Sequence, residues 1–225
     1  MLAKCFDNEV VALIGLGGTG SYLLDLLVKS PVKEIHAFDC DGYHVHNAFR
    51  SPGRLSENEL GLSKAEVYQN RYENFRHGLR VENKFIDESC TVDMGGVTFA
   101  FVCVDKGSAR AAIFNLLISL EIPFIDVGMG LTQKDRGLTG MARVTYYSPE
   151  RALALRELNL AEMNDTPDNV YRANIQVGEM NALNASLALI RYKQLMGFYG
   201  QDGAQVNTVF NISDLDLTGD SYDEV

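Results

Sequence analysis

Residues 10–20 read VVALIGLGGTG, a short apolar run followed at once by a glycine-rich loop that spans Gly15 to Gly20. A short apolar run that breaks at a glycine predicts a buried parallel strand. Leucines recur at helical spacing after the loop, so a helix is expected there. Glycine adopts positive φ and permits close backbone approach, so such a loop can wrap a phosphate at the N-terminus of a helix. The segment therefore predicts the opening strand, loop and helix of a nucleotide-binding fold.

The chain continues outward from this loop as alternating strands and helices. We expect further strands at Glu34–Phe38, Arg80–Ile86, Val97–Val104 and Pro123–Val127, and helices at Ser21–Lys29, Ser63–Phe75 and Ser108–Leu120. Strands that alternate with helices indicate an α/β fold, here a Rossmann-like, doubly wound, mostly parallel sheet.

The pattern changes after Gly128, where an added antiparallel C-terminal portion is expected. Strands are predicted at Gly140–Tyr147 and Val206–Ile212, a long helix at Gln176–Phe198, and a frayed acidic end from Ser213 onward. We treat 1–225 as a single domain. Its nucleotide-binding half is 1–128, and its partner-binding and dimerisation half is 129–225, with a mobile connection near 148–173.

Composition limits the class of protein. Of the 225 residues, 46% are hydrophobic and 22% are charged, which is typical of a soluble globular chain. No apolar run approaches the ~20 residues of a membrane span, and the segment before Val10 lacks the pattern of a secretory signal. The formal net charge of −10 argues against nucleic acid as a ligand. We expect a cytoplasmic protein that binds neither DNA nor membranes.

The four cysteines are Cys5, Cys40, Cys90 and Cys103, and no two form a C-x-x-C pair. This spacing argues against a structural zinc site, so we expect no zinc. A disulfide framework is not expected in a chain of this length without an export signal. We expect all four thiols to be reduced.

The second predicted strand ends in Asp39-Cys40-Asp41, about 20 residues beyond the loop, where a carboxylate can bind ribose hydroxyls. The glycine loop alone slightly favours NAD or FAD, and one acid suits either a dinucleotide or ATP. Arg50 and Lys64 follow, and a triphosphate needs such cations where a redox cofactor does not. Each could singly be a surface cation. Together with the loop and Asp41, they favour a triphosphate site.

The motifs occur in an order and spacing that resemble the ThiF/MoeB family, which is related to the ubiquitin-activating enzymes. They are G-x-G-G-x-G, Asp39-x-Asp41, Asn47, Arg50 and Gly61-x-x-Lys64. The likeness continues at Phe101–Asp105 with the following Arg110, at Gly140–Val144, and in the helix from Gln176. Residues 174–176 and 179–185 resemble bacterial members linked to ubiquitin-like proteins.

The resemblance implies ATP-dependent adenylation, in the presence of Mg²⁺, of the C-terminal glycine of a ubiquitin-like or sulfur-carrier protein. It implies that Arg50, Lys64 and Asp105 are catalytic and that Asp105 holds the metal. It also implies a nucleotide site formed by Gly15, Gly17, Gly18, Gly20, Asp39, Asp41, Asn47, Arg50 and Lys64. The residues alone leave Asp105 open to a second interpretation, as the N-cap of the next helix.

Two features depart from the family pattern. No cysteine follows Cys103, whereas thioester-forming members carry one in the later connection, so the chain resembles an adenylation-only enzyme. Relatives supply an arginine to a neighbouring subunit from an N-terminal segment. Only Lys4 precedes the loop here, which leaves Arg54 or Arg136 as candidates. The resemblance further implies a homodimer.

Three other readings stay open at the level of sequence. One is a related adenylating dehydratase that acts on a modified tRNA nucleoside, which the acidic net charge disfavours. Another is an NAD-binding Rossmann oxidoreductase, which Arg50 and Lys64 disfavour. The last is an inactive partner in a heterodimer, which has no reason to retain Arg50, Lys64 and Asp105 together.

Overall fold

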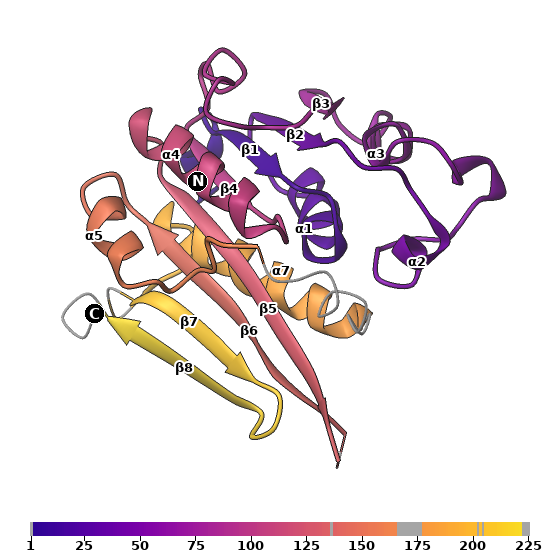
Figure 1. The fold of residues 1–225 in the computed structure, drawn as a ribbon. Coiled ribbons are helices and arrows are strands. Elements are labelled where there is room, and N and C mark those ends of the chain that lie inside the picture. Colours follow the sequence, from indigo (N-terminus) through magenta and orange to yellow (C-terminus); the bar gives the residue numbers. More distant parts are fainter. Residues whose placement is uncertain (1, 136, 166–176, 202, 204, 222–225) are drawn as a thin grey trace.

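One eight-stranded sheet runs through the molecule, with strand order β3-β2-β1-β4-β5-β6-β7-β8. The computed structural model describes all residues except 1, 136, 166–176, 202, 204 and 222–225 (Figure 1). The strands from β3 to β5 are parallel and those from β5 to β8 are antiparallel. The α/β fold class expected from the sequence is therefore confirmed.

The parallel half follows the strands expected from the sequence. Its strands are β1 (Val10–Ile14), β2 (Glu34–Asp39), β3 (Leu79–Asn83), β4 (Phe99–Val102) and β5 (Phe124–Lys134). Every residue of β1 and β4 is buried, as expected for strands covered on both faces. β5 extends well past the expected end at Val127, because its later residues pair with the next strand rather than with β4.

The antiparallel half consists of β6 (Gly137–Tyr147), β7 (Gln205–Asn211) and β8 (Asp216–Ser221). β5 and β6 form a long ribbon that projects beyond the neighbouring strands (Figure 1). The expectation of a frayed end from Ser213 was wrong, because β8 pairs with β7 along its length. β8 is an edge strand with mostly exposed side chains, so backbone pairing holds it without an apolar pattern.

The helices cover both faces of the sheet. They are α1 (Gly18–Val28), α2 (Val45–Ala48), α3 (Lys64–Tyr72), α4 (Gly107–Ser119), α5 (Ala152–Glu157) and α7 (Gly178–Leu195), with 3-10 turns at Leu2–Phe6 and Glu57–Glu59. None of these helices is long and apolar enough to cross a membrane. The connection expected near 148–173 contains α5, whose Ala152 and Leu155 are buried. Residues 166–173 and Gln176 lie outside the described part of the chain.

Two apolar clusters form the core, one on each face of the sheet. Val11 and Leu13 of β1 pack with residues of α1 and α7, whereas Val10, Ala12 and Ile14 pack with residues of α4 and α5. This division follows the alternation of side chains along a strand. β1 and β4 are therefore fixed from both sides, and the loops that follow them start from a rigid base.

The direction of the chain reverses beside β1. From β1 the chain proceeds to β2 and β3 on one side, and β4 then pairs with β1 on the other side. In open α/β sheets, ligands bind in the crevice beyond the carboxyl ends of the strands at such a switch point. The fold therefore predicts a site between the loop after Ile14 and the loop after Val102.

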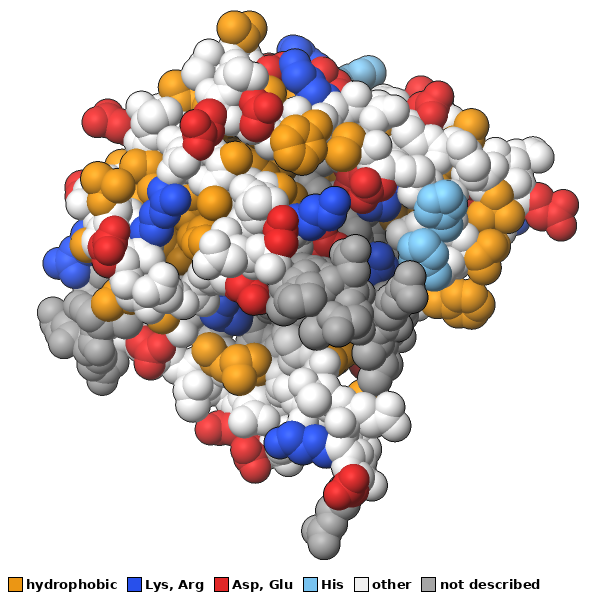
Figure 2. Space-filling model, in the orientation of Figure 1, with side chains coloured by type: hydrophobic (Ala, Val, Ile, Leu, Met, Phe, Trp, Pro, Cys, Tyr) orange, Lys and Arg blue, Asp and Glu red, His pale blue; other side chains and the backbone are white. Residues whose placement is uncertain are grey.

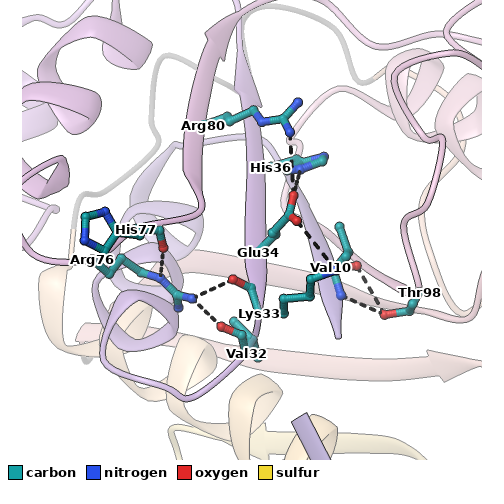
Figure 3. A network of polar contacts seen from close by, with 9 residues as sticks. All are labelled: Val10, Val32, Lys33, Glu34, His36, Arg76, His77, Arg80 and Thr98. Carbon is teal, nitrogen blue, oxygen red and sulfur yellow. Dashed lines mark hydrogen bonds and ion pairs between the residues drawn. The ribbon is translucent and has the colours of Figure 1, made fainter. Parts of the chain in front are cut away.

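A polar network lies at the other end of the strands from the predicted site, where β1, β2 and β4 begin (Figure 3). Glu34 is its acceptor: His36 Nε2 lies 3.2 Å from Oε2 and Arg80 Nη2 lies 3.6 Å from the same atom. His36 is buried, as expected for a histidine satisfied within the core. Arg76 donates to the carbonyl oxygens of Val32 and Lys33. These contacts fix the entry to β2, far from the predicted site.

We expect Glu34→Gln to lower the stability of the protein at neutral pH. The hydrogen bond from His36, with the charges of Lys33 and Arg80, lowers the pKa of Glu34 below its unfolded value of 4.5. A carboxyl whose pKa is lower in the folded state stabilises the fold above the unfolded pKa, and this contribution disappears as pH falls through the folded pKa.

Urea unfolding at several pH values checks this expectation. The difference between Glu34→Gln and the unaltered protein should be greatest at pH 6–7 and should shrink below about pH 4. Glu121→Gln, at an exposed position beyond α4, is the control. A difference that stays constant across the acid range would show that the carboxylate charge is not what stabilises this edge.

Candidate functional site

A cavity of about 1480 Å³ opens at the carboxyl ends of β1, β2 and β4 and continues along β5. The cavity is larger than the ~300–1,000 Å³ typical of a small-ligand pocket. It therefore has room for a nucleotide and part of a second molecule. Nine of the residues expected from the sequence border it: Gly15, Gly17, Gly18, Asp39, Asp41, Asn47, Arg50, Lys64 and Asp105. Gly20 is the exception.

The glycine loop curves around the end of β1, and its glycines have different reasons to lack a side chain. Gly15 has φ +96°, and a Cβ there would lie 2.6 Å from the carbonyl oxygen of Cys103. Gly17 is the N-cap of α1, and a Cβ there would meet nothing within 4 Å. Gly18 carries the Asn181 side chain against it. The bare backbone at Gly17 leaves the helix N-terminus open to an anion.

Gly20 serves packing. It is buried within α1, and a Cβ there would run into the carbonyl oxygen of Gly15. The residue allows the helix to approach the loop closely, and it does not border the cavity. Gly20 thus holds the loop against α1, and its expected contact with a nucleotide stays a prediction.

Asp39 points into the protein and organises the loop. Its Oδ2 accepts a hydrogen bond of 2.6 Å from the backbone amide of Leu16, and its Oδ1 accepts one of 2.8 Å from the amide of Asp41. Lys64 Nζ lies 3.3 Å from Oδ1. The carboxylate is buried and satisfied by donors from three segments. These contacts show Asp39 supporting the site from below.

Asp41 presents a carboxylate at the cavity wall. Its side chain is 69% exposed, and Oδ2 accepts a 2.7 Å bond from Lys64 Nζ. This bond is the main cause that lowers the pKa of Asp41, so the group is ionised at neutral pH. Lys64 is the first residue of α3, whose N-cap Ser63 is bonded reciprocally to Glu66. The capped helix start delivers the Lys64 ammonium between Asp39 and Asp41.

Asn47 and Arg50 come from the short segment around α2. Asn47 is buried, and its Oδ1 accepts a 2.7 Å bond from the amide of His44, which caps the helix. Arg50 follows the helix and borders the cavity, and its buried Nε has no hydrogen-bond partner among the described residues. Burial lowers the pKa of Arg50, while the charge of Asp105 opposes that shift. A guanidinium at the wall of a cavity can donate hydrogen bonds to an anion bound there.

Asp105 lies in the loop after β4, exposed at the cavity wall across from Arg50. The N-cap of α4 is Lys106, so Asp105 does not cap the helix as the alternative interpretation proposed. Ser108, where the helix was expected to begin, has its amide and hydroxyl bonded to Asp165, at 3.0 and 2.8 Å. Asp165 therefore supports the start of α4, and Asp105 keeps its place at the cavity.

Two histidines and two cysteines border the cavity, and neither cysteine is a reactive nucleophile. Burial, with the positive charge of Arg50, lowers the pKa of His46, which is therefore neutral at pH 7. His44 borders the cavity beside it. Burial raises the pKa of the Cys103 thiol, and burial with Asp41 and Asp39 raises that of Cys40. Both thiols remain protonated and poorly nucleophilic.

Asn181 was missed by the sequence reasoning as a site residue. It lies in the first turns of α7, its Oδ1 accepts a 3.0 Å bond from Thr19 Oγ1, and its Nδ2 donates to the carbonyl oxygen of Val177. Its side chain packs on Gly18 and borders the cavity. A buried asparagine on an apolar helix face was the available signal, since such a group requires a partner.

A buried charged triad on the β5 side of the cavity was also missed. Asp126 of β5 is fully buried and pairs with Arg110 Nε of α4 at 3.0 Å and with Arg143 of β6. Arg110 also donates to the carbonyl oxygens of Val104 and Glu162, which fixes the backbone beside Asp105. An acid within the apolar run of β5 was the signal in the sequence, because a buried carboxylate is retained only with partners.

Charges of both signs surround the middle of the face drawn in Figure 2, where lysine, arginine, acidic and histidine side chains lie near one another. The face is not a continuous basic patch of the kind that binds a nucleic-acid backbone. Among the described residues, no three His, Cys, Asp or Glu side chains are grouped as ligands for a metal ion.

The chain is similar to a known protein family and to a curated protein. The model of the ThiF family matches residues 4–222. The chain is 26% identical over 131 residues to the tRNA threonylcarbamoyladenosine dehydratase of Escherichia coli K12, a match that covers 56% of this chain and 48% of that protein. The chain thus spans about half the length of this curated relative.

Solved structures share the fold at low sequence identity. The crystal structure of PaaA superposes with a TM-score of 0.73 at 15% identity, over 98% of this chain and 66% of that one. E. coli MccB with ATP gives 0.68 at 16% identity, over 98% and 65%. TcdA (CsdL) gives 0.63 at 17% identity, over 87% and 89%.

The two glycines give a matched test of the loop. Gly20→Ala should destabilise the protein by about 1–3 kcal/mol, because its Cβ meets backbone that cannot move aside. Gly17→Ala should cost less, about 0.5–1 kcal/mol, since its Cβ enters open space and only the N-cap preference for glycine over alanine is lost. Gly17→Ala should instead weaken ATP binding about tenfold or more, by crowding the helix N-terminus.

Urea unfolding and calorimetric titration with ATP measure the two effects. Equal stability losses in both variants would contradict the distinction between a packing glycine and a cavity glycine. Gly200→Ala, where a Cβ also meets nothing within 4 Å, is the control for an open glycine away from the cavity.

Proposed function

This chain belongs to the ThiF family, and from that membership we propose that it adenylates the C-terminal glycine of a ubiquitin-like or sulfur-carrier protein, using ATP and releasing pyrophosphate. One observation carries the proposal. The glycine loop, Arg50, Lys64 and Asp105, which lie far apart in the sequence, border one cavity. A cavity with these groups suits a reaction in which two anions must meet.

The nucleotide would occupy the part of the cavity between β1, β2 and β4. Gly17 and Gly18 let its phosphates approach the N-terminus of α1, where backbone amides and the helix dipole favour negative charge. Asp41, exposed and ionised, would accept hydrogen bonds from the ribose hydroxyls. Asp39 would hold the loop in shape without touching the nucleotide, because its oxygens are already bonded.

Arg50 is the strongest candidate for the phosphates. Its guanidinium borders the cavity, and its Nε lacks a partner among the described residues. Two phosphate oxygens would accept hydrogen bonds from its planar guanidinium. Lys64 would add positive charge from its position between Asp39 and Asp41, nearer the ribose end. Asn47 would support this wall by accepting a hydrogen bond from the backbone amide of His44, the N-cap of α2.

The donor set at Asp105 fits magnesium better than zinc. Magnesium is held in nucleotide sites by one or two carboxylates together with phosphates and waters. The exposed carboxylate of Asp105 at the cavity wall matches that requirement. When bound there, magnesium would neutralise and orient the triphosphate.

The reaction needs no general base. A terminal carboxylate is ionised at neutral pH, so its oxygen attacks the α-phosphorus directly. The new bond joins that oxygen to the α-phosphorus, and the bond from the α-phosphorus to the bridging oxygen breaks to release pyrophosphate. Arg50 and Lys64 would offset the repulsion between the two anions. The chain has no cysteine after Cys103, so we expect the acyl-adenylate to be passed on rather than captured.

A second candidate substrate is a modified tRNA nucleoside, favoured by the likeness to the tRNA threonylcarbamoyladenosine dehydratase. The net charge of −10 and the mixed charges in Figure 2 favour a protein acceptor.

We also propose that the chain forms one functional unit, in which residues 1–128 bind the nucleotide and residues 129–225 bind the partner and form the homodimer. Arg54 remains a candidate for an arginine offered to a neighbouring subunit, and Arg136 lies outside the described residues.

Isotope exchange between pyrophosphate and ATP tests the proposal. Exchange should require a protein that ends in glycine, and Arg50→Ala and Asp105→Ala should each reduce it at least about 100-fold, because both groups stabilise charge at the phosphates. Both variants should keep their melting temperatures within a few degrees, since neither side chain lies in the core.

The controls are Arg80→Ala and Asp214→Ala, exposed residues remote from the cavity, which should exchange normally. Exchange that depends on tRNA would support the second candidate. Tight NAD binding without ATP binding would support an oxidoreductase, and ATP binding without exchange under any acceptor would support an inactive partner. Normal exchange in Arg50→Ala would overturn the proposed site.

A further inference from the structure

The cavity extends past the nucleotide groups along β5, and this extension has its own charged wall. On the side facing β4, the ladder of β5 ends at Asp126. The residues of β5 from Val127 to Gln133 then border the cavity. On the other side, β6 places Arg143 directly opposite Gly128. The guanidinium of Arg143 therefore comes from β6, the strand next to β5, and borders the part of the cavity that the nucleotide would not fill.

Arg143 is held in one place. One terminal nitrogen donates to Asp126, the other to the hydroxyl of Thr145, and Thr145 in turn donates to Asn207 Oδ1 at 2.8 Å. A Cβ on Gly128 would lie 2.8 Å from Nη2 and 3.2 Å from Nε of Arg143. The absence of a side chain at Gly128 thus leaves room for the guanidinium across the strand. Such a fixed group loses little entropy when it binds a ligand.

The triad carries more positive than negative charge. Asp126 is its single carboxylate, fully buried, and two guanidinium groups share it. Arg110 is turned inward by bonds to Val104 and Glu162. Arg143 retains 13% of its side-chain exposure and borders the cavity, with N–H groups beyond the two used by Asp126 and Thr145. A guanidinium offers five donors, and its fork matches a carboxylate.

We propose that Arg143 binds the carboxylate of the acyl acceptor and that Asp126 positions it for this purpose. The inference rests on the proposed function. Arg50 and Lys64 supply the charge at the nucleotide end, whereas Arg143 lies on the β5–β6 side, where the acceptor has room. The carboxylate loses its negative charge when its oxygen joins the α-phosphorus. Arg143 therefore binds the acceptor before reaction and contributes mainly to its affinity.

The test uses the complete chain with magnesium and α,β-methylene-ATP, and N-acetylglycylglycine and its C-terminal amide as probes. The side-chain Nε–Hε resonance of Arg143, assigned by its loss in Arg143→Lys, is followed by NMR. The acid should shift this resonance and the amide should not. Equal shifts, or no shift with the acid up to its solubility limit, overturn the inference, and Arg143→Gln supplies the same assignment should Arg143→Lys not fold.

Variants then separate this inference from the proposed function. Arg143→Gln should raise the KM for a glycine-ended acceptor at least tenfold, leave ATP affinity unchanged, and change kcat little. Arg143→Lys should fall between, and Arg80→Gln is the matched control. An unchanged KM for the acceptor, with or without weaker ATP binding, refutes the proposed role of Arg143 and leaves the proposed adenylation activity intact. Selective binding of the acid without any adenylation supports the role and refutes the proposed function.

Discussion

The buried carboxylate of Asp39 holds together the segments from which the site is built. It accepts one bond from the glycine loop at Leu16 and another from the end of β2 at Asp41, and it pairs with Lys64 at the start of α3. A buried charge is stable only when fully satisfied, so these three segments must all be in place together. The loop geometry, the exposed Asp41 and the position of Lys64 are consequences of that single requirement.

The same principle recurs on the other side of the cavity. Asp126 is buried between Arg110 and Arg143, and Arg110 bonds to the backbone that leads to Asp105. The two buried acids thus fix the two walls, one beside the nucleotide groups and the other beside β5 and β6. Removing Asp126 would leave two buried guanidinium groups without their shared carboxylate, which is more damaging than the loss of one hydrogen bond. The charged groups exposed to the cavity depend on others that are not exposed.

The sequence predicted the parts of the fold that have a local signal. β1, β2 and β4 were recognisable because short apolar runs end in glycine or aspartate, and the fold class followed from their alternation with helices. β8 was missed because an edge strand is held by backbone pairing and carries no apolar face. The length of β5 and β6 was missed because their distal residues are exposed and pair mainly with each other.

For the site, the sequence predicted which residues border the cavity better than it predicted what each of them contacts. It grouped Asp39 and Gly20 with the nucleotide but did not predict that the Asp39 oxygens bond to the protein or that Gly20 packs against Gly15. Asp126 and Arg143 could be noticed as charges in strands, but their pairing depends on the register of β5 against β6. Such pairing joins residues far apart in the chain, and no local pattern encodes it.

That register is itself secured farther along the β5–β6 ribbon, where Gly130 and Gly140 also border the cavity. Gly140 has φ +149°, and a Cβ there would strike the carbonyl oxygen of Gly130. A slip of one residue between the strands would bring a side chain to this crossing and would also turn Arg143 to the opposite face of the sheet. Gly140 therefore acts as a stop, and it keeps a guanidinium aligned with its carboxylate several residues away.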